Sequence, residues 1–494
     1  MLLLGIDLGT SSVKVSVVDA HTRRCLASVS YPDDTERTIV ARHPGWAEQD
    51  PRQWWQDVQA AIRKAHATQA YRPADIGAIG IAYQMHGLVV VDKNQQVLRD
   101  AIIWCDSRAV PYGAQAQAAI GAERCRQRLL NSPGNFTAAK LAWVQEHEPA
   151  VFAQIAQVLL PGDYLALQLT GAATTSVAAL SEGIFWDFAE GGLSADVFGH
   201  FGFGPALVPP VRPVFGEHGA LTAAVAHELG LRPGIPVTYK AGDQPNNALS
   251  LGVLEPGEVA ATAGTSGVIY AVTDQLFSDP QSRVNTFAHV NHAAGQTRLG
   301  VLLNINGCGI LNRWLRQAVG PAQSYDALNQ QAPAVPAGSD GLLCLPFGNG
   351  AERLLGNRQL GAHFAHLDLK THSPAHLLRA GQEGVAFAFR YGLDVLRENG
   401  LQPTGVKAGL ANMFRSAVFA RSFVQATGLE VALYQTDGSV GAALGAGIGA
   451  GLFATPAEAF ADMQPLQTLR PEPDDGIYED TYQRWQQELL RQLA

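Results

Sequence analysis

The sequence predicts an α/β protein with two domains of similar design, and three observations support this prediction. The chain has 494 residues, of which 47% are hydrophobic and 16% charged, so two or three domains with sizeable cores are expected. Residues 2–31 contain three strand-like runs separated by short polar turns. The first of these turns carries Gly9-Thr10-Ser11, and a second Gly-Thr-Ser turn starts at Gly264, with Thr10 and Thr265 lying 255 positions apart. Two halves that begin with the same hairpin indicate duplicated domains with a cleft between them.

The first half alternates strand and helix patterns after its three opening strands at 2–7, 13–19 and 25–31. A helix is expected from Pro51, with Asp50 as its N-cap, because apolar residues recur at spacings of three and four from Trp54 onward. Further along, the patterns predict a strand at 76–82, a hairpin at 88–104 that turns at 92–94, and helices at 138–147 and 151–159. This mixture is typical of an α/β domain.

The second half begins near a short strand at 237–241, which ends in Gly242-Asp243-Gln244 before a helix that starts near Pro245. We place the domain boundary there, which gives domains at 1–245 and 246–494. Strands are expected at 258–263 and 268–272, and helices at 374–399, 416–427 and 439–452. The glycine-rich stretch at 445–451 lies inside the last helix and lacks GxGxxG spacing, so close packing explains it better than dinucleotide binding.

Charge and cysteine content exclude several classes of protein. The formal net charge is −9 and no run of like charges occurs, so a general nucleic-acid surface is not indicated. Five cysteines with no CxxC pair predict neither a disulfide framework nor a zinc site. The most apolar long stretch, 440–454, is too short to span a membrane. We expect a cytoplasmic enzyme whose partners are small molecules.

The first hairpin combines a carboxylate with a glycine and hydroxyl groups. Asp7 lies between two apolar strand residues, and a buried carboxylate is costly unless a partner such as hydrated Mg²⁺ satisfies it. The turn at Thr10 and Ser11 offers N–H and hydroxyl groups to an anionic oxygen. Taken alone, a polar turn whose aspartate accepts backbone hydrogen bonds explains the pattern as well. The second copy at Gly264 and Thr265 favours two turns that grip phosphates from both sides.

Familiar nucleotide motifs are missing from the sequence. No Gly-Lys dipeptide occurs, which excludes a Walker A loop, and the HRD and DFG motifs of protein kinases are absent as well.

Asp243 is the best candidate for a general base, because it ends a strand at the junction of the two halves. The alternative is an aspartate that only caps the following helix. The segment Gln84 to Gly87 follows another strand, and Trp104, Asp106 and Arg108 end the predicted hairpin, so His86 can line one wall of a sugar pocket together with these three residues. A lone histidine or tryptophan is more often structural.

Five ordered motifs together resemble the FGGY carbohydrate kinases, and two more segments are similar to signatures of that family. The five motifs are Asp7 to Ser12, Gln84 to Gly87, Trp104 to Arg108, Gly242 to Gln244 and Gly264 to Gly267, and the two signature-like segments are Lys140 to Trp143 and Glu383 to Phe387. The likeness spans nearly the whole chain.

The resemblance implies an actin-like fold of two ribonuclease-H-like domains, with ATP and Mg²⁺ in the cleft between them and a sugar held mainly by the first domain. It implies that Asp243 is the catalytic base toward a terminal hydroxyl, with D-xylulose the first substrate to test, and that Asp7 holds Mg²⁺. It further implies a homodimer. The implied sugar contacts are Met85, His86, Trp104, Asp243 and Gln244, and the implied ATP contacts are Thr10, Ser11, Gly264, Thr265, Gly409 and Asn412.

Three alternatives remain open at this point. The substrate can be another ketose, a polyol or a sugar acid, since segment 407–416 and residues 245–247 depart from the pattern of many relatives. A different class is an actin-like or Hsp70-like ATPase without sugar transfer. A third is a catalytically idle sugar sensor built on the same fold.

Overall fold

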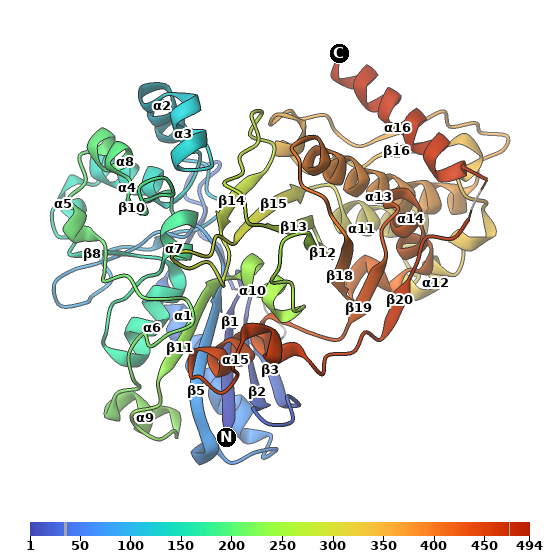
Figure 1. Cartoon of the computed structure of the whole chain (residues 1–494). Helices are drawn as coiled ribbons and strands as arrows, with labels where there is room; N and C mark the ends of the chain where they lie inside the picture. The colour runs from blue at the N-terminus through green and yellow to red at the C-terminus, as the bar shows by residue number, and fades with distance from the viewer. Residues whose placement is uncertain (34–36, 474) are drawn as a thin grey trace.

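The computed structural model in Figure 1 describes residues 1–33, 37–473 and 475–494, which form two sheet-containing α/β domains. The first sheet has the strand order β11-β5-β1-β2-β3. Its strands are β1 (Leu2–Leu8), β2 (Val13–Asp19), β3 (Cys25–Tyr31), β5 (Ile76–Tyr83) and β11 (Val237–Gly242). β1, β2 and β3 form an antiparallel meander, while β5 and β11 run parallel to β1.

The second sheet repeats this connectivity and adds a strand at each edge. Its order is β14-β15-β13-β12-β18-β19-β20, with strands β12 (Glu258–Ala263), β13 (Gly267–Thr273), β14 (Asn285–Ala288), β15 (Leu299–Ile305), β18 (Gly405–Gly409), β19 (Val431–Tyr434) and β20 (Gln467–Leu469). β12, β13 and β15 form the antiparallel meander, and β18 and β19 run parallel to β12. The predicted duplication is therefore confirmed strand by strand, as two actin-like domains.

Helices cover both sheets. α1 (Pro51–Ala67) packs on β2 and β3, and its N-cap Asp50 accepts a hydrogen bond from the backbone N–H of Arg52, as predicted. The second sheet is covered by α11 (Gly309–Val319), α13 (Pro374–Glu398), α14 (Ala417–Thr427) and α16 (Ile477–Leu493), and α12 (Tyr325–Asn329), β16 (Leu343–Leu345) and β17 (His363–Ala365) connect these helices.

Two further helices, α10 (Asp243–Ser250) and α15 (Gly438–Gly449), pack against each other beside β1 and β11. α15 comes from the second half of the chain and yet lies on the first sheet. Its glycines permit this contact, because a Cβ on Gly445 would come within 2.7 Å of the Tyr239 ring and one on Gly449 within 1.9 Å of the Thr238 carbonyl oxygen. The prediction that packing explains this glycine cluster is confirmed.

The segment between β5 and β11 builds a helical lobe on the first domain (Figure 1). It contains α2 (Val110–Ile120), α3 (Ala122–Arg128), α4 (Thr137–His147), α5 (Pro149–Phe152), α6 (Pro161–Thr170), α7 (Val177–Glu182), α8 (Ala195–Phe201) and α9 (Ala223–Leu229). Short strands accompany them: β6 (Val89–Val91), β7 (Ala101–Ile102), β8 (Gln157–Leu159), β9 (Trp186–Asp187) and β10 (Gly192–Leu193). β4 (Glu48–Gln49), which precedes β5 in the chain, pairs with β7.

One predicted element in this lobe is wrong. The helix predicted at 151–159 stops at Phe152, and residues 157–159 form β8 instead. The hairpin predicted at 88–104 does fold back after residue 92, but only isolated antiparallel bridges join its arms, since β6 pairs with β8 and β7 pairs with β4. A short apolar run fits a helix or a buried strand equally well, so only the partners from elsewhere in the chain decide between them.

The edge strand β14 of the second sheet docks against this lobe. The side-chain amide of Asn131 donates to the carbonyl oxygen of Thr286 at 2.6 Å and accepts from its N–H at 2.9 Å. Ser181 accepts from the N–H of Ala288 at 2.9 Å. Polar side chains of the first domain therefore occupy the hydrogen-bonding edge of the second sheet. In the part of the chain that the structure describes, no helix is long and apolar enough to cross a membrane.

Candidate active site

Asp7 and Asp243 are the two carboxylates of the predicted reaction centre, and they lie close enough to influence each other. Asp7 follows Ile6 in β1, and Asp243 is the first residue of α10, directly after β11. Burial, and then the charge of Asp7, raise the pKa of Asp243 to about 7. Burial also raises the pKa of Asp7 to about 6, with Lys14 opposing this shift and Asp437 adding to it.

The structural alternatives for these two aspartates have different outcomes. The N-cap of α10 is Gly242, and Asp243 is the first residue of the helix. The backbone N–H groups of Asp243 and Gln244 and the side chain of Gln244 nevertheless donate to the Asp243 carboxylate, which partly offsets the effect of burial on its pKa. Within the described ranges, Asp7 accepts no hydrogen bond from its own turn; the turn is closed by a bond from the N–H of Gly9 to the carbonyl oxygen of Ser12, at 3.0 Å.

The first hairpin is linked to the predicted sugar wall through Thr10. Its hydroxyl donates to Gln84 Oε1 at 3.2 Å and accepts from the indole Nε1 of Trp104 at 2.9 Å. Trp104 is 51% exposed, so much of its side chain is accessible to a ligand while its N–H is fixed. Ser11, the residue after Thr10, is exposed.

A cavity of about 490 Å³ lies in the second domain beside the second hairpin. Three of the predicted ATP contacts, Gly264, Thr265 and Asn412, line it, whereas Gly409 ends β18 next to this segment and is not a lining residue. Further lining residues come from α11, α12, α13 and the turn after β18, among them Asn312, Arg313, Tyr325, Asn329, Gln382 and Arg415. This size and mixed polar lining suit a ligand such as a nucleoside.

The second hairpin is held in place by the start of α11. The N–H of Gly309 donates to the carbonyl oxygen of Gly264 at 2.9 Å, and the N–H of Ile310 donates to that of Thr265 at 3.1 Å. A Cβ on Gly309 would lie 2.4 Å from the Gly264 oxygen, so this approach requires glycine. α11 was not predicted from the sequence. The available signal was the spacing of its two buried leucines, Leu311 and Leu315, which lie four positions apart after Gly309.

Met85 and His86 lie beside the strand end that carries Asp243. A Cβ on Gly242 would come within 2.5 Å of Met85 Cγ, which shows how closely the two strand ends approach. His86 has a φ of +61°, a left-handed conformation that is unfavourable for a non-glycine residue. Its ring packs edge-on against Phe136 at 4.8 Å and against Phe287 of the second domain at 5.3 Å. Gln244 is half-buried next to Asp243 and donates to it.

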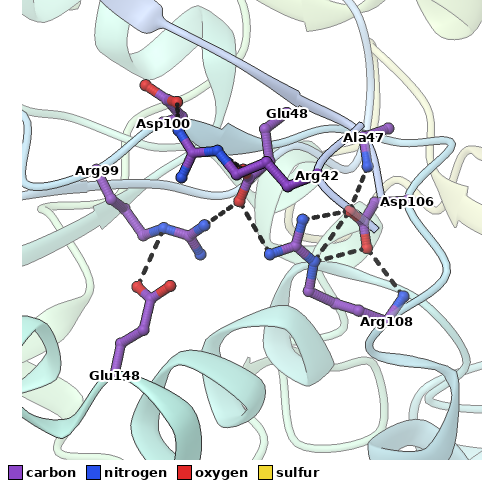
Figure 2. A network of polar contacts seen from close by, with 8 residues as sticks. All are labelled: Arg42, Ala47, Glu48, Arg99, Asp100, Asp106, Arg108 and Glu148. Carbon is purple, nitrogen blue, oxygen red and sulfur yellow. Dashed lines mark hydrogen bonds and ion pairs between the residues drawn. The ribbon is translucent and has the colours of Figure 1, made fainter. Parts of the chain in front are cut away.

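Asp106 and Arg108 do not line a sugar pocket, and that part of the prediction is wrong. Both are buried and face each other, with Arg108 Nη2 donating to Asp106 Oδ2 at 2.6 Å and Nη1 donating to Glu48 Oε1 at 2.9 Å (Figure 2). The guanidinium group also lies 3.7 Å from the centroid of the Trp46 ring.

This network fixes the turn that carries Trp104, since Asp106 also accepts a hydrogen bond from the N–H of Ala47 (Figure 2). Arg99 extends the network by pairing with Glu48 and Glu148.

The surroundings of Asp7 are compatible with Mg²⁺ held in part by other ligands. No group of three or more acidic, histidine or cysteine side chains within residues 1–33, 37–473 and 475–494 could hold a metal by itself. Mg²⁺ usually keeps several waters and uses one or two carboxylates together with substrate phosphates, so the single carboxylate of Asp7 with Asp243 nearby fits such a site.

Comparison with known proteins covers both domains. Residues 2–250 match the N-terminal domain of the FGGY family of carbohydrate kinases, and residues 259–452 match the C-terminal domain of that family. A xylulose kinase of Escherichia coli (strain K12) is 32% identical, with 100% of both chains covered. A xylulose kinase of Klebsiella pneumoniae is 33% identical, covering 90% of this chain and 88% of its own. The crystal structure of xylulose kinase from Rhodospirillum rubrum superposes with a TM-score of 0.88 over 99% of both chains, at 30% identity.

Proposed function

This chain belongs to the FGGY family of carbohydrate kinases, and we propose on that premise that it transfers the γ-phosphoryl group of ATP to O5 of D-xylulose. The observation that carries the reaction type is the pair Asp7 and Asp243, whose charges interact at one edge of the first sheet where β1 and β11 flank β5, with a nucleotide-sized cavity in the other domain. The xylulose kinases that match the whole chain support the choice of sugar.

In this proposal Asp243 is the general base. A carboxylate whose pKa is about 7 is well matched to accept a proton from a hydroxyl group at neutral pH. Asp243 would take the proton of O5 as that oxygen attacks the γ-phosphorus, and the bond from phosphorus to the β–γ bridging oxygen would break to release ADP. The base stands at the junction of β11 and α10, directly after Gly242.

The other proposed roles divide between substrate and nucleotide. Met85, His86, Trp104 and Gln244 would orient the sugar, and Thr10, Ser11, Gly264, Thr265, Gly409 and Asn412 would contact ATP. Asp7 would hold Mg²⁺, which when bound neutralises charge that develops on the phosphate oxygens. All five cysteines are free thiols, which agrees with the proposed cytoplasmic location. A homodimer remains a prediction.

The test is an ADP-release assay with Mg²⁺ and ATP across pentuloses, hexuloses, polyols and aldonates, on the wild type and on Asp243→Asn. We expect turnover on D-xylulose and a loss of about 10²- to 10⁴-fold in kcat for the variant, while ATP still binds. Asp187→Asn is the matched control, because this buried aspartate pairs with Arg128 in the lobe and has no role in the proposal.

The outcomes separate the alternatives. Turnover on another sugar keeps the mechanism and changes the substrate. ATP hydrolysis that no sugar stimulates supports the ATPase class. Sugar binding without any ATP turnover supports a sensor, and either of the last two results refutes the proposed reaction.

A further inference from the structure

Glu182 is a buried acidic residue that the proposed reaction does not use. It is the last residue of α7 and is only 2% exposed. An isolated ionised carboxylate is costly in such surroundings, so its polar atoms need partners. Lys140, whose charge influences it, donates instead to the carbonyl oxygen of His86, at 2.7 Å.

One half of the Glu182 carboxyl group holds His86. Oε1 accepts the backbone N–H of His86 at 3.2 Å, and Nδ1 of the His86 ring donates to the backbone carbonyl oxygen of Glu182 at 3.1 Å. Burial, with help from Lys140, lowers the pKa of His86 to about 3, so the ring is neutral. A neutral imidazole that donates from Nδ1 has Nε2 as an acceptor. These two hydrogen bonds to Glu182 therefore fix both the left-handed backbone and the tautomer of His86, which is a predicted sugar contact.

The other half of the carboxyl group has no protein partner. Oε1, and not Oε2, accepts the hydrogen bond from His86, and no described residue forms a hydrogen bond with Oε2. It lies beside Gly242, where a Cβ would be 2.7 Å from it and 2.5 Å from Met85 Cγ. Oε2 thus lies between two strand ends. Met85 and His86 follow the end of β5, and Asp243 follows the end of β11.

The charge state of the group suits a hydroxyl ligand. Burial, and the nearby charges of Asp243 and Asp163, raise the pKa of Glu182 well above its usual range, against the opposing effects of the His86 N–H and Lys140. The neutral acid that this favours can donate from Oε2, whereas an ionised carboxylate can only accept.

We propose that Glu182 is a further sugar-binding residue, with Oε1 fixing the backbone of His86 while Oε2 forms a hydrogen bond with one hydroxyl group of the sugar. This inference rests on the proposed function, because it takes the sugar site to lie between Met85, His86 and Asp243. It adds a specificity-determining contact, since a buried polar group rejects an analogue that lacks the matching hydroxyl.

The experiment compares Glu182→Gln and Glu182→Leu with the wild type, on whichever sugar the wild type phosphorylates. Glutamine keeps an acceptor for His86 and a donor toward the ligand, so we expect its kcat/KM to stay within about fivefold of the wild type. Leucine removes both, and we expect a loss of about 10- to 100-fold in kcat/KM for the sugar with an unchanged KM for ATP. Asp187→Asn controls for loss of a buried carboxylate in the same lobe.

Monodeoxy analogues of that sugar then distinguish a direct contact from a structural effect. For the analogue that lacks the contacted hydroxyl, the gap in kcat/KM between the wild type and Glu182→Leu should narrow to the part caused by the lost hydrogen bond to His86, while for the other analogues the full 10- to 100-fold gap should persist. Should Glu182→Leu fail to fold, Glu182→Gln is compared with the wild type in the same way. The difference in kcat/KM is then up to about fivefold, and it should disappear only for the analogue that lacks the contacted hydroxyl.

A gap that is equally wide for every analogue, or no gap for any, overturns the direct contact. Wild-type protein that phosphorylates no sugar overturns the proposed function, and the role of Glu182 with it. The two failures are therefore distinguishable.

Discussion

Gly438→Ala tests whether the position of the Asp7 carboxylate matters for activity. Gly438 is the first residue of α15, and the second half of the chain thereby supplies a backbone surface against which Asp7 packs. A Cβ added at this position would lie 2.2 Å from Asp7 Oδ2 and 2.9 Å from Asp7 Cγ. The φ of this glycine is not in the left-handed region, so alanine introduces the contact without backbone strain.

The geometry gives the size of the effect. To reach even a 3.0 Å contact, the carboxylate must retreat by about 0.8 Å, and a displacement near 1 Å in a catalytic site costs about 10²-fold in rate. The side chain can make this movement by rotation, and alanine favours a helix over glycine by about 1 kcal/mol, so global stability should change little. We expect kcat to fall by about 10- to 100-fold, with a higher Mg²⁺ concentration needed for half-maximal activity.

The assay is ADP release as a function of Mg²⁺, together with thermal unfolding. Gly199→Ala is the matched control, because Gly199 lies within α8 and a Cβ there meets nothing within 4 Å. This control should retain full activity. A Gly438→Ala enzyme that folds normally and keeps kcat within threefold of the wild type would refute the reasoning about Asp7.

Three further predictions concern other parts of the site. The kcat/KM for the sugar should rise by about tenfold per pH unit and level off above about pH 7, because Asp243 acts only when deprotonated and its pKa is raised to about 7; a pH–rate profile measures this. Gly309→Ala should raise KM for ATP by about tenfold and leave KM for the sugar unchanged, because its Cβ meets the backbone oxygen of Gly264 at 2.4 Å; substrate-saturation curves measure both constants. Arg108→Leu should destabilise the first domain by about 3 kcal/mol and lower its unfolding temperature by about 5 to 10 °C, because Asp106 is left buried without its partner; calorimetry measures this.

Each of these predictions has a result that contradicts it. A pH profile that is flat from pH 5 to 8 excludes Asp243 as the base in the form described. An unchanged KM for ATP in Gly309→Ala shows that the second hairpin does not position the nucleotide. For Arg108→Leu the control is Arg72→Leu, which breaks an exposed pair with Asp75 and should cost little; equal destabilisation by both variants would contradict the role of burial.

The sequence by itself determined the duplicated α/β architecture and the elements nearest to the chemistry. Short strand-like runs with turn residues between them predict the meander at 2–31 and the hairpin at 258–272 because those strands pair with their chain neighbours. The positions of Asp7, Thr10, Asp243 and Thr265 follow from the same local signals, since each stands at the end of a strand.

Only the tertiary structure decided how distant segments meet. The apolar run at 157–159 became a strand because β6 was available to pair with it, and Asp106 and Arg108 became a buried pair because Glu48 and Trp46 enclose them. Neither outcome has a local signature, since burial and pairing partners come from residues dozens of positions away.

Glu182 is the clearest case of this limit. Nothing in the sequence around residue 182 distinguishes it from an ordinary helix-terminal glutamate. Its proposed role depends on His86, 96 positions earlier, and on Gly242, 60 positions later, which the first sheet brings to the same edge. A sequence records which groups are present, whereas the free-energy cost of burying one of them, and hence its proton affinity and its partners, exists only once the chain has folded around it.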